Sequence, residues 1–151
     1  MATKISTIKA NIKAILEALQ RQEILRDVQV DDLKKNVFTR NFSKFPVAIL
    51  TTPATTAQVE TNTQNMRTYA FEILVLLNRD EITDSDQVED LIDTMLNAFD
   101  NDVTLKGDSG VGAADGGSEP SSSGAGPVEG TNYTAFSILV RAKAIRDITL
   151  T

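Results

Sequence analysis

The chain has 151 residues, of which 41% are hydrophobic and 24% are charged, and its 15 basic and 21 acidic side chains give a net charge of −6. A chain of this length is expected to form one domain whose core needs no disulfide or structural metal to fold. Because cysteine, histidine and tryptophan are absent, disulfide frameworks, thiol and imidazole catalysis, and most zinc, copper and haem sites are excluded.

Charge is distributed unevenly along the chain. Residues 1–45 carry 9 basic and 5 acidic side chains, whereas residues 46–151 carry 6 basic and 16 acidic ones. Such runs usually belong to solvated surfaces, and head-to-tail self-association is the alternative. The acidic total disfavours nucleic-acid binding, which depends on clustered lysine and arginine. No apolar leader follows Met1 and no apolar run approaches the ~20 residues that span a bilayer, so we expect a soluble, unexported protein.

The first predicted element is an amphipathic helix over residues 4–25. Apolar side chains recur there every three or four residues, and no glycine or proline interrupts the run. Thr3 or Ser6 would serve as its N-cap. Residues 26–44 fit neither the helical nor the strand period and remain unassigned. Residues 45–51 are apolar and partly β-branched, and they predict a strand.

A long polar segment separates this strand from a second one. Residues 52–65 are dominated by threonine, glutamine, asparagine and alanine, and we expect them to form a projecting loop. Residues 67–78 predict the next strand, in which every second side chain from Tyr69 to Leu77 shares one face. Its second half is apolar on both faces, which indicates burial on both sides by helices or by another subunit.

The remaining elements complete an α+β pattern. An apolar stripe from Val88 to Phe99 predicts a second helix, with Asp84 or Ser85 as its N-cap. Residues 131–149 alternate as a long last strand, and residues 103–105 are its candidate partner. We therefore predict a single α+β domain over residues 1–151, with a mostly antiparallel sheet flanked by two main helices.

A glycine- and serine-rich segment, residues 107–130, holds all eight glycines of the protein. Its composition predicts a flexible excursion in an isolated subunit, and it is far longer than a connection requires. It lacks the third glycine of a dinucleotide fingerprint and the surrounding strand and helix that nucleotide binding needs. We interpret it as a linker or as a loop that orders against a partner during assembly. The residues assigned to this assembly loop are Gly107, Gly110, Gly112, Gly116, Gly117, Gly124, Gly126 and Gly130.

Ten carboxylates between residues 80 and 108 form the second candidate feature. They do not fit an EF-hand, because a loop starting at Asp84 would have Val88 and Glu89 where an oxygen ligand and a glycine are required. Glycosidase-type use of paired carboxylates usually needs aromatic platforms, which are scarce here. We expect no catalytic residue, no cofactor and no metal ligand, and we interpret the acids as a solvated face or as a lumen or interface face that repels DNA. The residues assigned to that face are Asp80, Glu81, Asp86, Glu89, Asp90 and Asp93.

The order of these elements resembles the tail-terminator proteins of long-tailed bacteriophages. The resemblance covers nearly the whole chain and is carried by the amphipathic first helix, the strand Phe45-Pro46-Val47-Ala48-Ile49-Leu50, the strand Arg67-Thr68-Tyr69-Ala70-Phe71-Glu72-Ile73-Leu74-Val75, the acidic helix Val88-Glu89-Asp90-Leu91-Ile92 and the last strand. The segment 107–130 is longer than expected for that family.

The resemblance implies a non-enzymatic virion protein that is assembled in the host cytoplasm and located in the tail or neck. It implies a homo-oligomeric ring, expected to be a hexamer, that caps the tail tube protein and joins it to the head–tail connector or neck proteins. DNA would pass through its channel without specific binding, and no membrane would be involved. The alternatives are another head–tail joining or neck protein and, from a different class, a small acidic metal-binding protein.

Overall fold

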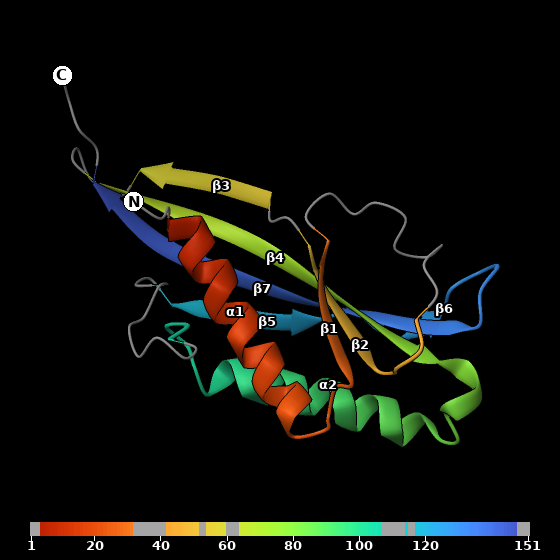
Figure 1. Ribbon diagram of the computed structural model, residues 1–151. Coiled ribbons are helices and arrows are strands. Elements are labelled where there is room, and N and C mark those ends of the chain that lie inside the picture. The colour runs from red at the N-terminus through yellow and green to blue at the C-terminus, as the bar shows by residue number, and fades with distance from the viewer. Residues whose placement is uncertain are drawn as a thin grey trace.

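The computed structural model describes residues 4–31, 42–51, 54–59, 64–106, 114 and 117–147. Within these ranges the chain forms two α-helices, one short 3-10 helix and a single sheet of seven strands (Figure 1). The predicted α+β class is confirmed, since all pairings in the described sheet are antiparallel except that between the first two strands. The order along the chain is α1 (Lys4–Arg21), β1 (Asp27–Asp31), β2 (Val47–Thr51), β3 (Ala54–Val59), β4 (Gln64–Asn78), η2 (Arg79–Glu81), α2 (Ser85–Asp100), β5 (Ser118–Ser122), β6 (Gly126–Pro127) and β7 (Tyr133–Asp147).

The first helix ends earlier than its periodicity predicts. Glu23 has a φ of 62°, in the left-handed region, and the N–H of Ile24 donates to the carbonyl of Leu19 at 3.0 Å. This pattern is a Schellman-type helix end, which uses up the last carbonyls of the helix and turns the chain away. Ile24 and Leu25 still pack into the core beside α1, although they lie beyond its end, and Leu25 is fully buried.

Two long strands form the centre of the sheet. The strands lie in the order β1-β2-β4-β7-β5, with β3 beside the first half of β4 and β6 beside the start of β7. Strands β4 and β7 pair over all 15 residues of each, from Gln64 opposite Asp147 to Asn78 opposite Tyr133. At about 3.4 Å per residue each of them is roughly 50 Å long.

Both helices cover the same face of this sheet, and the main core lies between them and the strands (Figure 1). The predicted alternation is confirmed for both long strands, because the same-face sets beginning at Tyr69 in β4 and at Phe136 in β7 are buried in that core. Burial of apolar surface stabilises this layer by about 25 cal/mol per Å² removed from water. The largest fully buried side chains include Phe71, Phe99 and Phe136.

A smaller core covers part of the opposite face. Phe45, Val47, Ile49 and Leu76 are buried there, and the ring of Tyr133 lies 5.6 Å from that of Phe45. This cluster confirms that the second half of β4 is buried on both faces. Phe42 and Phe45, from the segment before β2, pack there against Tyr133 of β7, so residues of the same chain cover the sheet at this end.

Two predictions about the strands were wrong. The expected loop 52–65 contains β3, and the segment 26–44, which had no assignment, contains β1. Residues 103–105 form a turn, not a strand, and the partner of β7 is instead formed by residues 118–127 within the glycine-rich segment. Pairing with a neighbouring strand has imposed extended structure on β1, β3 and β5, whose sequences have little strand preference of their own.

Candidate functional site

The acidic candidates lie on one exposed surface at the start of α2. Asp84 is the N-cap, as predicted, and its Oδ1 accepts a hydrogen bond from the N–H of Asp86 at 2.8 Å. Val88, Leu91, Met95 and Phe99 face the core, so the carboxylates on the opposite side of the helix point to solvent. This surface, which we name the acidic face, consists of Asp86, Glu89, Asp90 and Asp93, all of which are exposed.

Asp80 and Glu81 lie just before α2, in the short helix η2 that follows β4. Asn132, at the start of β7, donates from Nδ2 to Asp80 Oδ2 at 2.8 Å and to Asn78 Oδ1 at 3.0 Å. The Arg79 guanidinium donates to the carbonyl of Tyr133 at 3.2 Å. These bonds hold η2 against the start of β7. The six acidic candidates therefore lie on two consecutive elements, two of them on η2 and four on α2.

The electrostatic environment of the acidic face is one of unneutralised negative charge. The ion pairs of the described residues are Lys13 with Glu17 at 3.7 Å and Lys143 with Glu119 at 3.6 Å, and neither involves α2. In the same part of the chain no three carboxylates converge in a way that could hold a metal ion. Such a face repels other polyanions and attracts cationic surfaces.

The glycine candidates fall into two groups. Gly107, Gly110, Gly112 and Gly116 lie outside the described residues. Gly117, Gly124, Gly126 and Gly130 are described, and all four lie in or beside the strands β5 and β6 or in the turn that leads to β7. The prediction of one flexible excursion over residues 107–130 was therefore wrong for residues 118–127, which the ladder with β7 orders.

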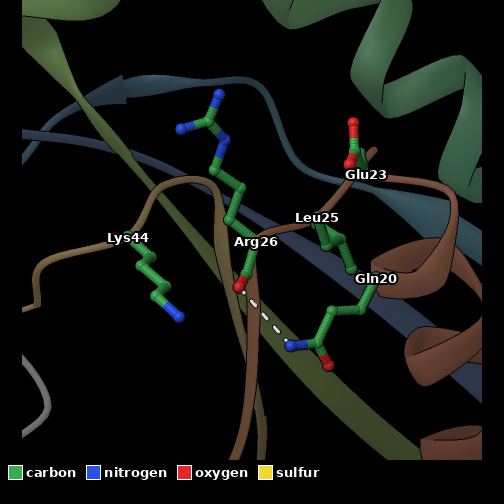
Figure 2. A pocket seen from close by; sticks show the side chains of 5 residues that line it. All are labelled: Gln20, Glu23, Leu25, Arg26 and Lys44. Carbon is green, nitrogen blue, oxygen red and sulfur yellow. Dashed lines mark hydrogen bonds between the residues drawn. The ribbon is translucent and has the colours of Figure 1, made fainter.

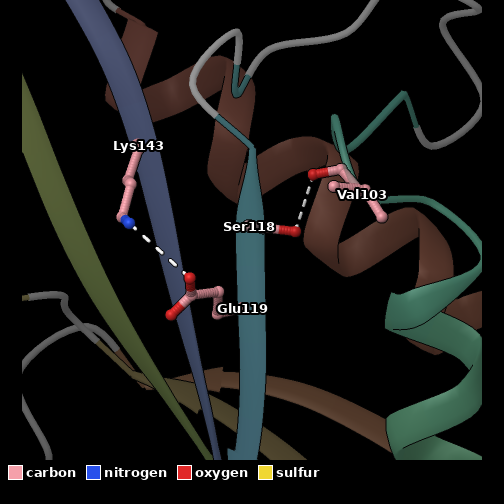
Figure 3. A network of polar contacts seen from close by, with 4 residues as sticks. All are labelled: Val103, Ser118, Glu119 and Lys143. Atoms are coloured by element: carbon pink, nitrogen blue, oxygen red, sulfur yellow. Dashed lines mark hydrogen bonds and ion pairs between the residues drawn. The ribbon is translucent and has the colours of Figure 1, made fainter.

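Strand β5 is held from both sides (Figure 3). The hydroxyl of Ser118 donates to the carbonyl of Val103 at 2.8 Å, which ties β5 to the turn after α2. The carboxylate of Glu119 points to the other face of the sheet, where it pairs with Lys143 of β7. The alternation of side chains along the strand places these two neighbours on opposite faces. Neither contact was predictable from local sequence, because Val103 and Lys143 are distant from Ser118 and Glu119 along the chain.

Asn11 is a buried polar residue that sequence reasoning missed. Its side chain is only 5% exposed, and its Nδ2 donates to the carbonyl of Leu105 at 2.7 Å. Leu105 itself has a φ of 55° and a fully buried side chain. Asn11 follows Ile8 by three residues and therefore lies on the apolar face of the helix. A polar amide at such a position predicts a buried hydrogen bond.

Several hollows open on the described surface, and three of them adjoin the loops and the start of α2. The first, of about 440 Å³, lies between the turn after α1 and the segment before β2, and Arg26 and Lys44 reach it from these two segments (Figure 2). A second, of about 260 Å³, lies between Phe45 and Leu91. The third, of about 600 Å³, lies beside the start of α2 and has Ile82 and Ile92 among its lining residues.

No described helix is long and apolar enough to cross a membrane. A scan against protein-family models matches no family, and a search of curated proteins finds no similar sequence.

Proposed function

We propose that this protein is a structural virion subunit, a tail terminator that assembles as a ring on the end of a bacteriophage tail tube and joins the tube to the head connector. The succession of helix, strands, acidic helix and long last strand supports this function, because it is the order on which the resemblance to tail terminators rests. The partners of the ring are the tail tube protein on one side and connector or neck proteins on the other. The net charge of −6 favours passage of DNA through the ring without binding.

The observation that carries the proposal is an open end of the sheet, formed by β3, the first half of β4 and the second half of β7 (Figure 1). Strand β5 reaches only as far as Lys143, whose N–H donates to the carbonyl of Gly117 at 2.9 Å. In the described chain, β7 beyond Lys143 has no partner strand on that side, and β3 has none on its outer side.

Unpaired backbone groups at a sheet edge favour pairing with another chain. Here two such edges lie on opposite sides of the same three strands. That arrangement suits head-to-tail contacts between identical copies, and head-to-tail contacts close into rings when the rotation between neighbours permits it.

The experiment that tests this function is removal of the gene from the phage genome, with a plasmid copy as the control. Loss of a terminator is expected to give tail tubes of uncontrolled length and heads without tails in electron micrographs. Tails of normal length that fail to join heads would assign the protein to the neck instead. Normal particles that lack the protein would refute a virion role.

Calorimetry with calcium and magnesium tests the alternative from another class. The terminator function predicts no heat of specific binding. Binding at micromolar concentrations of either ion would instead favour a small acidic metal-binding protein.

A further inference from the structure

A basic patch faces the solvent where α1 ends and β2 begins. It consists of Arg26 and Lys44, which are both exposed and lie around the hollow of about 440 Å³ (Figure 2). The N–H of Arg26 donates to the carbonyl of Pro46 at 2.9 Å, and the Gln20 amide donates to the carbonyl of Arg26 at 3.4 Å. These bonds fix the two cationic segments side by side.

The patch is not neutralised by the described part of its own chain. Neither Arg26 nor Lys44 takes part in the ion pairs of the described residues. Glu23 also lines the hollow, so two cations and one carboxylate lie around it, together with the fully buried Leu25. No α2 residue is among the residues that line the hollow, so the acidic face does not meet the basic patch of its own chain.

We propose that the basic patch of one copy receives the acidic face of a second copy, so that neighbouring subunits contact each other head to tail. This inference rests on the proposed function and names a surface through which its ring forms. The acidic face offers four exposed carboxylates, and the patch offers two cations beside a hollow that admits side chains. Complementary charge of this kind fixes the register of two surfaces and accelerates their encounter.

A second copy fits the patch better than DNA does. The protein carries a net charge of −6, so a polyanion is repelled at long range, and two cations beside Glu23 give little affinity for a phosphate backbone. The acidic face of the same protein is present at the concentration of the assembling subunits. A contact between two different surfaces of one chain is also the kind that closes into a ring.

Charge reversal on each side tests the contact. The first variant combines Arg26→Glu with Lys44→Glu, and the second combines Asp86→Lys, Glu89→Lys and Asp90→Lys. Each is expected to weaken self-association about tenfold or more in sedimentation velocity at low salt, because like charges then meet. An equimolar mixture of the two variants is expected to recover association, because each reversed surface meets its reversed partner. Circular dichroism of each variant checks that it is folded.

A control variant makes the same change of charge elsewhere. Lys13→Glu with Lys106→Glu reverses two exposed cations, one on α1 and one after α2, that lie outside both the patch and the open end of the sheet, and it is expected to associate like the wild type. A carbodiimide, which joins a lysine directly to a carboxylate, is expected to link Lys44 of one copy to the acidic face of another in mixed ¹⁴N- and ¹⁵N-labelled protein.

Three results would overturn the contact. The first is that the first variant and the control associate equally well. The second is that the wild type shows no association or cross-link even at high protein concentration. The third is that the wild type binds duplex DNA and the first variant does not, which would assign the patch to phosphate binding. If rings persist in the charge-reversed variants, the proposed contact is refuted but the terminator function is not. Normal tails after deletion of the gene would remove the function itself.

Discussion

Replacement of Asn11 by alanine probes the contact between α1 and the turn that follows α2. The change removes the only side-chain donor that the described structure provides to the carbonyl of Leu105. A buried acceptor left without a partner costs about 1–3 kcal/mol. Alanine at a helical position returns up to about 0.7 kcal/mol through its higher helix propensity. The free energy of unfolding is therefore expected to fall by roughly 1–2 kcal/mol.

The matched control is Asn97→Ala, an exposed position of α2 that gains the same helix propensity and loses no side-chain hydrogen bond of the described structure. For a protein of about 150 residues, 1 kcal/mol corresponds to about 2–4 °C in the midpoint of thermal unfolding. The gain in helix propensity cancels between the two variants, so we expect a midpoint roughly 2–12 °C lower for Asn11→Ala than for Asn97→Ala. Differential scanning calorimetry, with urea titration as a second probe, measures the difference. Equal midpoints would refute the role given to this hydrogen bond.

Asn11→Asp separates the lost donor from the lost volume. The introduced carboxyl has almost the same shape as the amide, but its ionised form has no proton to donate to the carbonyl of Leu105. Burial raises the pKa of this carboxyl above its value in the unfolded chain, so its destabilising effect grows as the pH rises and shrinks as the pH falls. The difference in unfolding free energy from the wild type, measured at matched pH, is expected to be smaller at pH 4 than at pH 7. A difference that is independent of pH would contradict the reasoning.

Three further substitutions test local features of the fold. Gly117→Ala is expected to lower the unfolding free energy by about 1–2 kcal/mol in urea titration, because φ is +89° there, whereas Gly124→Ala, where an added Cβ meets open space, stays within about 0.5 kcal/mol of the wild type. Asp84→Ala is expected to cost about 1 kcal/mol through loss of the N-cap, against little change for the exposed mid-helix Asp93→Ala, and equal losses would count against the cap. Phe99→Ala removes a fully buried ring and is expected to cost about 3–5 kcal/mol by thermal unfolding, so a loss below 1 kcal/mol would show that the core is not packed as described.

Periodic elements were predictable from the sequence, because each of them carries its own apolar pattern. The stripe of α2 and its N-cap Asp84 follow from local spacing, and the alternation in β4 and β7 follows from a period of two. Strands β1, β3 and β5 were not predictable in this way. Their sequences are short, polar or interrupted by proline, and each is extended because a neighbouring strand offers it hydrogen bonds.

The same distinction holds for the candidate surfaces. The exposure of the acidic face follows from its position opposite the apolar stripe of α2, so sequence reasoning identified its residues. The basic patch was not identified, because Arg26 and Lys44 are 18 positions apart and are brought together by the bond from Arg26 to the carbonyl of Pro46. Asn11 and Ser118 were missed for the same reason, since their partners Leu105 and Val103 lie far along the chain.

The sheet edges indicate where strand addition between copies is opposed and where it is favoured. The N–H of Lys143 donates to the carbonyl of Gly117, and the N–H of Ser123 donates to the carbonyl of Ser137. In this antiparallel register the backbone N–H and C=O groups of odd-numbered residues in β5 point toward β7, and those of even-numbered residues point away from the sheet. Pro120 therefore occupies an outward position, where its missing N–H interrupts the row of donors, as in edge strands that are protected from pairing. Strand β3 has neither a proline nor a charged residue within Ala54–Val59. Backbone pairing with another chain is thus favoured at β3 and opposed at β5. A contact on the side of β5 and α2, such as the proposed charge-complementary one, would therefore be made by side chains.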